Sequence, residues 1–253
     1  MRVKAESEAY IVAIEKRELI DLAAPFWAGE AEVVERYFAG PRSIETDLHW
    51  LRAQAFKETR HLRALSPEMQ EQYWASGTIP DHPEGPEETR KLAEEMKHFD
   101  LIAALITSLT GRRATLEEFP LLEEERKLQE LRAPYRAGTE FERTLVDFTE
   151  GGGGSMYDML TRVEGGEFER RIVEAFRVIL ADEVIHGPGQ IHALAQLSRD
   201  EDTWQRAGEI VVAIGKQRLQ MRNEMFSFPL DERRIAEIEA GEIEPWPSPV
   251  DIA

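Results

Sequence analysis

Apolar residues recur at helical spacing along most of the chain, and this periodicity constrains the fold more than any other feature. Positions 44, 48, 51, 55, 58, 62 and 65 step by three or four residues, and every one except position 58 is apolar. A stripe of this kind predicts an amphipathic helix with one face toward a core. We find no convincing run of alternating apolar and polar residues that would mark a strand, so the sequence predicts an all-α protein.

The same reasoning places the helices along the chain. Helices are expected at about 6–22, 29–39, 44–65, 87–110, 116–132, 139–163, 167–198 and 202–226, with a short successor to the third ending near residue 75. Pro and Gly residues in 76–86 predict a loop, and Gly111 is placed to cap the helix before it. Pro188 predicts a kink within 167–198, and a proline-rich tail is expected to end the chain.

Composition excludes several classes of function. A net charge of −18 disfavours extended contact with nucleic acid or anionic lipid. The absence of cysteine excludes disulfides, iron–sulfur clusters and thiolate metal sites. No apolar run resembles a signal peptide or spans a bilayer, so we expect a cytoplasmic protein without membrane association.

Three glutamates interrupt the apolar stripes of the long predicted helices. Glu58 is the one charge on the stripe of 44–65, Glu95 on that of 87–110, and Glu183 lies on that of 167–198. Each is followed three residues later by a histidine, which gives the pairs Glu58–His61, Glu95–His98 and Glu183–His186. Residues three apart share one helix face, so each pair is able to reach the same ion.

A buried carboxylate costs several kcal/mol unless a counter-charge is present. One such residue is explained by a nearby arginine, and a single Glu-x-x-His in a chain with 49 acidic residues is easily a solvated coincidence. Three of them, each with its glutamate on an apolar stripe, call for a shared explanation. A dinuclear metal centre would supply the positive charge that makes burying several carboxylates tolerable.

The set resembles the metal site of the ferritin-like di-iron carboxylate superfamily. In that family two helices of a four-helix bundle each contribute one Glu, and the other two each contribute Glu-x-x-His. The order here is Glu58, Glu95–His98, a fourth carboxylate, and Glu183–His186. Glu150 is the fourth carboxylate that fits, because it lies 33 residues before Glu183, as Glu58 lies 37 before Glu95. The competitors for this place lie near the helix ends: Glu140, Glu142 and Glu164.

The resemblance implies the fold and the ligand roles. It implies one ferritin-like domain, with a bundle core over about 43–198 and additional flanking helices in 1–42 and 199–253. His98 and His186 would each anchor one metal, Glu95 and Glu183 would bridge, and Glu58 and Glu150 would bind terminally. His61 exceeds the family pattern, and its alternatives are an extra ligand, a neighbour of the ligands or a bystander.

The resemblance also implies a reaction class. Two iron ions are the expected cofactor, with Mn/Fe or di-Mn centres as alternatives, and O2 the co-substrate. We expect an oxidase or monooxygenase that acts on a small molecule, with electrons from a separate reductase or from the substrate. The alternatives are an iron-handling or peroxide-scavenging protein of the ferritin or rubrerythrin kind, and a metal-free helical scaffold. A homodimer is compatible with each.

The stretch "TEGGGGSMYDML" predicts where a substrate would bind. "GGGGS" alone is the composition of a linker, but Glu150 precedes it and Tyr157 and Leu160 follow it at helical spacing. We therefore expect a helix whose glycines open space beside the metal, and we assign Gly151, Gly153 and Gly154 to a substrate cavity. Tyr157, two turns beyond Glu150, is a candidate redox or hydrogen-bonding partner of the site, with a packed core tyrosine as the alternative.

Overall fold

The computed structural model describes residues 2–183, 190–197 and 200–246, except for the side chains of 2–16, 61, 116 and 201. These residues form helices and no strand, which confirms the all-α prediction for the described part of the chain. The helices are α1 (Arg2–Ala39), α2 (Ile44–Glu58), α3 (Arg60–Arg63), α4 (Pro67–Ser76), α5 (Pro86–Thr110), the 3₁₀ helix η1 (Leu116–Glu118), α6 (Glu123–Arg136), α7 (Glu140–Phe148), α8 (Gly151–Leu160), α9 (Glu167–Glu183), α10 (Gln190–Leu197), α11 (Glu201–Met225) and α12 (Glu232–Glu239).

Local sequence explains where several of these helices begin and end. Ser43 caps α2 and forms a capping box with Thr46, as Thr139 and Glu142 do for α7. Gly111 ends α5 in the left-handed conformation at φ 73°, as its position predicted. These caps satisfy backbone groups that a helix end would otherwise leave without partners.

Predicted boundaries differ from the structure in several places. Residues 2–39 form one helix rather than two, because Pro25 is accommodated within α1. The helix expected at 44–65 ends at Glu58, and α3 continues it after Thr59. The tail expected after 226 contains α12, which begins with an Asp231 cap.

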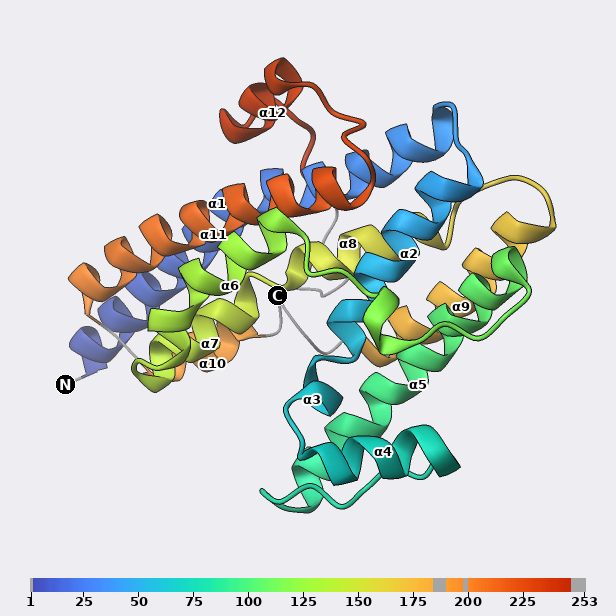
Figure 1. Ribbon diagram of the computed structural model, residues 1–253. Coiled ribbons are helices and arrows are strands. Elements are labelled where there is room, and N and C mark those ends of the chain that lie inside the picture. Colours follow the sequence, from blue (N-terminus) through green and yellow to red (C-terminus); the bar gives the residue numbers. More distant parts are fainter. Residues whose placement is uncertain (1, 184–189, 198–199, 247–253) are drawn as a thin grey trace.

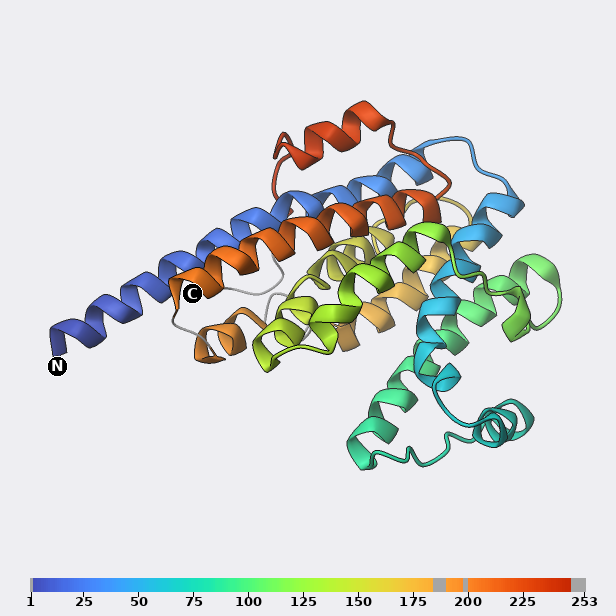
Figure 2. The same ribbon diagram turned by 60° about the vertical axis from the view of Figure 1, so that its left-hand side comes forward.

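Two long helices, α1 and α11, lie side by side along much of their length (Figures 1 and 2). The α1 helix also packs along α8, while α2 packs on α5, α8 on α9, and α5 on α9. Both views show α3, α4 and the start of α5 as an arm that projects from the remaining helices. Along the described part of the chain, none of the helices combines the length and apolarity that crossing a membrane requires.

The buried apolar side chains form two cores. The first surrounds Trp50, Phe99 and Phe176 of α2, α5 and α9, and the second surrounds Trp27 and Trp204 of α1 and α11. On α1 the change from one core to the other occurs across Glu30, which is fully buried between Trp27 and Val33. A layer of buried polar residues therefore separates the cores, and this layer leads to the candidate site.

Candidate metal centre and its cavity

A cavity of about 100 Å³ opens between α2, α5, α6, α8, α9 and α11. Carboxylates lie at one end of it and arginines at the other. Its lining comprises Gln54, Phe56, Lys57, Glu58, Arg60, Glu95, Glu125, Gln129, Arg132, Glu150, Gly153, Gly154, Tyr157, Glu183, Arg218 and Arg222. The fold thus brings all four predicted glutamates to one cavity, together with Tyr157 and two of the three predicted glycines.

The acidic end gathers residues from three helices. Glu58 is the last residue of α2 and is only 4% exposed, and one ligand atom each from Glu58, Glu95 and His98 lie within 4.8 Å of one another. Glu183, at the described end of α9, brings its Oε1 to 3.8 Å from His98 Nδ1. Glu58, Glu95 and His98 therefore face a common point, and Glu183 approaches His98 from α9.

The two ring nitrogens of His98 have different surroundings. Its Nε2 lies 3.1 Å from Asp182 Oδ2, and Asp182 also receives Lys97 Nζ at 2.7 Å. Its Nδ1 is buried without a hydrogen-bond partner, 3.7 Å from Glu58 Oε2 and 3.8 Å from Glu183 Oε1. Asp182 thus favours the tautomer with the proton on Nε2, which leaves a lone pair on Nδ1. A histidine held in this way by a carboxylate is typical of metal ligands.

The separations around Nδ1 fit a metal ion. They are too long for hydrogen bonds but fall within the span of two ligands that each lie about 2.0–2.2 Å from one cation. Burial lowers the pKa of His98, but Glu58, Asp182 and Glu183 outweigh it and raise that pKa, so either a proton on Nδ1 or a divalent cation would satisfy all three groups. The residues present therefore fit a metal, with Glu58, Glu95, His98 and Glu183 as its holders.

The carboxylates at this end compete for few counter-charges, namely Arg60 and His98. Burial raises the pKa of Glu95 to about 10, and the neighbouring carboxylates of Glu58 and Glu183 act in the same direction. Glu95 and Glu58 also hydrogen bond to each other, so they share a proton. Adjacent carboxylates cannot both ionise cheaply, and a proton or a cation must relieve them.

Gln54 connects the acidic end to Tyr157. Its Nε2 donates to Glu58 Oε1 and lies 3.0 Å from the Tyr157 hydroxyl oxygen, so one side chain ties α2 to α8. Burial raises the pKa of Tyr157 well above its ordinary value, and Glu58 and Glu183 add to this effect. Tyr157 therefore keeps its hydroxyl proton beside the carboxylates. Its predicted position near the site agrees with this contact.

Glu150 lines the same cavity but lies with the basic residues. It forms the turn between α7 and α8, where its Oε1 is 3.2 Å from Arg132 Nη1 and 3.3 Å from Arg136 Nη2. Burial alone would raise the pKa of Glu150, but Arg132 and Arg218 outweigh it and lower the pKa to about 2. Among the four predicted glutamates, Glu150 thus has its counter-charges within the protein.

The four glycines form the first turn of α8, so the helix predicted there is present but begins after a break at Thr149 and Glu150. The surroundings of these glycines differ. A Cβ on Gly152 would lie 1.9 Å from Glu30 Oε1, so only glycine admits that buried carboxylate. A Cβ on Gly154 would meet nothing within 4 Å, and Gly153 faces Arg218 and Arg222. Gly151 is buried but is not part of the cavity lining.

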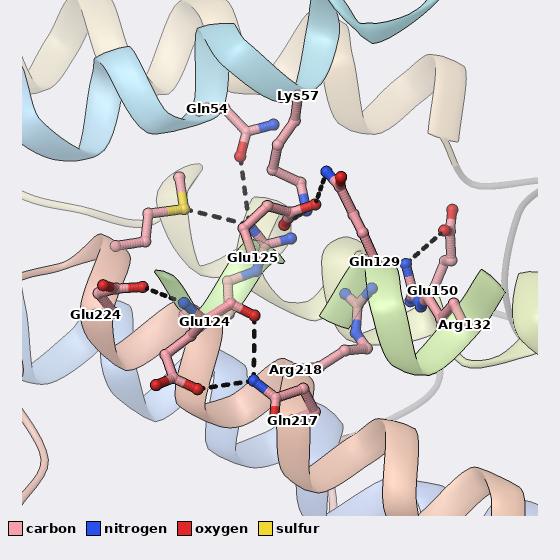
Figure 3. A network of polar contacts seen from close by, with 12 residues as sticks. Gln54, Lys57, Glu124, Glu125, Gln129, Arg132, Glu150, Gln217, Arg218 and Glu224 are labelled. Carbon is pink, nitrogen blue, oxygen red and sulfur yellow. Dashed lines mark hydrogen bonds and ion pairs between the residues drawn. The ribbon is translucent and has the colours of Figure 1, made fainter. Parts of the chain in front are cut away.

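The basic end consists of ion pairs between distant helices. Glu30 of α1 accepts hydrogen bonds from Arg218 at 2.6 and 2.9 Å and from Arg222 at 2.8 Å, and all three side chains are buried. Figure 3 shows Glu125 of α6 meeting Lys57 of α2, 3.1 Å away, and Gln129 one turn along α6. Two turns beyond Glu125, Arg132 points to Glu150 (Figure 3).

Two predicted histidines lie outside the described part of the chain: His186, and the side chain of His61. The sequence reasoning missed Asp182, which adjoins Glu183, and Gln54, four residues before Glu58. It also missed the basic end. The signal available for Arg218 and Arg222 was their spacing of one turn among apolar residues of a long helix.

Comparison of the chain with protein-family models, with curated proteins and with solved structures finds no match. What the molecule does is therefore inferred from the chemistry of these residues.

Proposed function

We propose that this protein binds redox-active metal, iron in the first place, through Glu58, Glu95, His98 and Glu183. The observation that carries the proposal is His98 Nδ1, buried without a partner and facing two carboxylates at 3.7 and 3.8 Å. Burial of His98 Nδ1 costs free energy that a bound cation would offset, because this nitrogen has lost its hydration without gaining a hydrogen bond. His186 would complete the set as the sequence pattern predicts.

We infer further that α2, α5, α8 and α9 act as a ferritin-like bundle. The pairing of α2 with α5 and of α8 with α9, and the packing of α5 on α9, support this inference. The cavity favours an oxidase or oxygenase for a small organic molecule over an iron-storage protein, since open space beside the metal ligands suits a substrate.

Bound iron would supply the electrons and the open coordination position through which O2 is activated. The chain's own groups have distinct tasks around it. Asp182 orients His98 through Nε2, and Gln54 holds the Glu58 carboxylate by donating to Oε1. Tyr157 keeps a hydroxyl proton at the cavity wall, where it is able to donate to a substrate oxygen or nitrogen.

Metal content tests the first part of the proposal. Protein expressed with added Fe(II) or Mn(II) should contain up to about two ions per chain, the number that a dinuclear bundle site holds. Glu95→Gln should lose most of this metal. Glu94→Gln is the matched control, because Glu94 is the preceding residue of α5, exposed and paired with Arg90. Equal metal content in the two variants would remove the basis of the proposal.

Oxygen consumption tests the second part. Added Fe(II) should consume O2 until about two ions per chain have reacted, and then stop. Continued uptake of iron with formation of a mineral would instead support the iron-handling alternative.

A further inference from the structure

The basic end of the cavity holds more cations than carboxylates to pair with them. Four cationic side chains meet there, from α2, α6 and α11, and three carboxylates are paired with them. The cations are Lys57, Arg132, Arg218 and Arg222, and the carboxylates are Glu30, Glu125 and Glu150. These seven residues of the basic end therefore carry one more positive charge than negative charges.

Arg132 has an unused donor at the cavity. The residue is 5% exposed and lines the cavity, and its Nη1 and Nη2 donate to Glu150 and Thr149. Its Nε, however, is buried without a hydrogen-bond partner. Burial lowers the pKa of Arg132 to about 10, and Arg218 and Arg136 act in the same direction, which agrees with an excess of positive charge.

Space for a ligand adjoins these donors. A Cβ on Gly153 would lie 3.7 Å from Arg218 Nη2 and 3.8 Å from Arg222 Nη2, and one on Gly154 would meet no atom within 4 Å. The bare backbone of α8 thus keeps open the region between the arginines and Tyr157. Glycines in a helix cost about 0.5–1 kcal/mol each relative to alanine, so open space here is maintained at the expense of stability.

We propose that the basic end, with Arg132 as its principal donor, binds the carboxylate of the substrate, and that the substrate is a small organic acid. The opposite end of that molecule would face Glu58, Glu95 and Tyr157. The oxidation itself rests on the function proposed above, whereas the binding of the acid rests on the arginines.

Size and chemistry narrow the ligand class. A cavity of about 100 Å³ is smaller than the roughly 150 Å³ cavity that admits benzene, so the acid has few heavy atoms. Guanidinium groups match the planar carboxylate in charge and hydrogen-bond geometry. The lining away from the arginines includes Phe56 and the Tyr157 ring, which suit a short carbon chain.

Isothermal titration calorimetry on protein whose metal content has been measured tests the proposal. The probes are propionate and pyruvate, each compared with its uncharged amide, together with inorganic phosphate. At least one carboxylate should bind about tenfold or more tightly than its amide, and Arg132→Gln should remove that preference. Arg126→Gln, an exposed position on α6 whose arginine pairs with Glu123 and Glu130, should not change it.

A second variant keeps the test informative if Arg132→Gln does not fold. Gly154→Leu retains every charge, has open space for its Cβ, and should not lower the unfolding temperature. It should abolish binding of carboxylate and amide alike.

The outcomes separate the two proposals. Suppose that the protein holds metal and that the carboxylate probes bind the Arg132→Gln variant as tightly as they bind the wild type. The metal then binds the probes, and the present inference is wrong. Preferential binding of phosphate, or equal binding of acids and amides, also overturns it. If the protein takes up no metal while the preference for carboxylates depends on Arg132, the proposed function fails and the acid site stands.

Discussion

The two ends of the cavity bury carboxylates in opposite ways. At the basic end Glu30 is fully buried, and Arg218 and Arg222 hold its pKa below the ordinary value despite that burial. At the acidic end burial and two neighbouring carboxylates raise the pKa of Glu95 to about 10. Glu30 is buried and Glu95 is partly buried, so the opposite shifts come from their partners. The basic end has its counter-charges within the chain, whereas the three carboxylates of the acidic end share Arg60 and His98.

This difference teaches how to interpret a buried glutamate. Arginines from a distant helix pair with Glu30, and this pairing offsets much of the free-energy cost of removing its carboxylate from water. Glu30 therefore has a structural role. Glu58, Glu95 and Glu183 have each other and His98, which leaves a proton or a metal to balance their charge. Three carboxylates that share Arg60 and His98 as cations are therefore the group that a bound metal would stabilise.

The largest effect is expected from breaking the internally paired end. Glu30→Gln leaves Arg218 and Arg222 buried without their counter-charge, and should lower the free energy of unfolding by about 3–5 kcal/mol in chemical denaturation. Glu94→Gln, at an exposed ion pair, should have little effect. A loss as small as that of the control would show that the buried network contributes little to stability.

The same variant gives a pH test. The pKa of Glu30 is lowered from 4.5 in the folded protein, so its contribution is present above pH 4.5 and is lost as pH falls through the lowered pKa. Wild-type stability should therefore fall over that acidic range by more than the stability of Glu30→Gln. Parallel curves for the two proteins would contradict this account.

At the acidic end, adding metal should change the stability of the protein more than replacing a carboxylate does. Mn(II) or Fe(II) at about 100 times its dissociation constant should stabilise the wild type by about 2.7 kcal/mol, measured as a rise in the unfolding temperature. Glu95→Gln should show little stabilisation by metal. Without metal its stability should stay close to that of the wild type, because the introduced amide is able to donate to Glu58 as the shared proton does.

A smaller effect is expected at Asp182. Its removal frees His98 to change tautomer or rotate, and Asp182→Ala should weaken metal binding about 10–100-fold in a competition titration. Lys97→Met is the control, because Lys97 contacts Asp182 but not the proposed ligands. Unchanged metal affinity in Asp182→Ala would mean that His98 is oriented by other contacts.

The smallest effect is expected at Gly154. Gly154→Ala has room for the new methyl group and should raise the free energy of unfolding by about 0.5–1 kcal/mol, seen in thermal or chemical denaturation. Gly152→Ala should do the reverse, because its methyl group would collide with Glu30. Stabilisation at Gly152 would show that the Glu30 carboxylate is not held where the structure places it.

Helical periodicity predicted the all-α class and most of the helices, because each apolar stripe is a local property of consecutive residues. Its errors lie where tertiary contacts override local signals. The two helices predicted over 6–39 are one helix in the structure, with Pro25 inside it, and α12 lies in a segment predicted to be an irregular tail.

The sequence also predicted part of the candidate site. Stripe position singled out Glu58, Glu95 and Glu183, since a charge on an apolar face is visible in the sequence itself. The sequence also placed Glu150 and the glycines beside the same cavity, but it assigned Glu150 a place among the metal ligands, whereas the structure pairs it with Arg132 and Arg136. Whether Glu150 binds metal stays a prediction.

The sequence by itself determined the helical class and the buried carboxylates, because both follow from residue type and spacing along single helices. Only the tertiary structure decided which carboxylates have counter-charges. The arginines that pair with Glu30 lie 188 and 192 residues away, and no local pattern relates such positions. The same long-range packing gives neighbouring glycines different surroundings. Gly152 lies against Glu30, whereas Gly154 faces open space at the cavity.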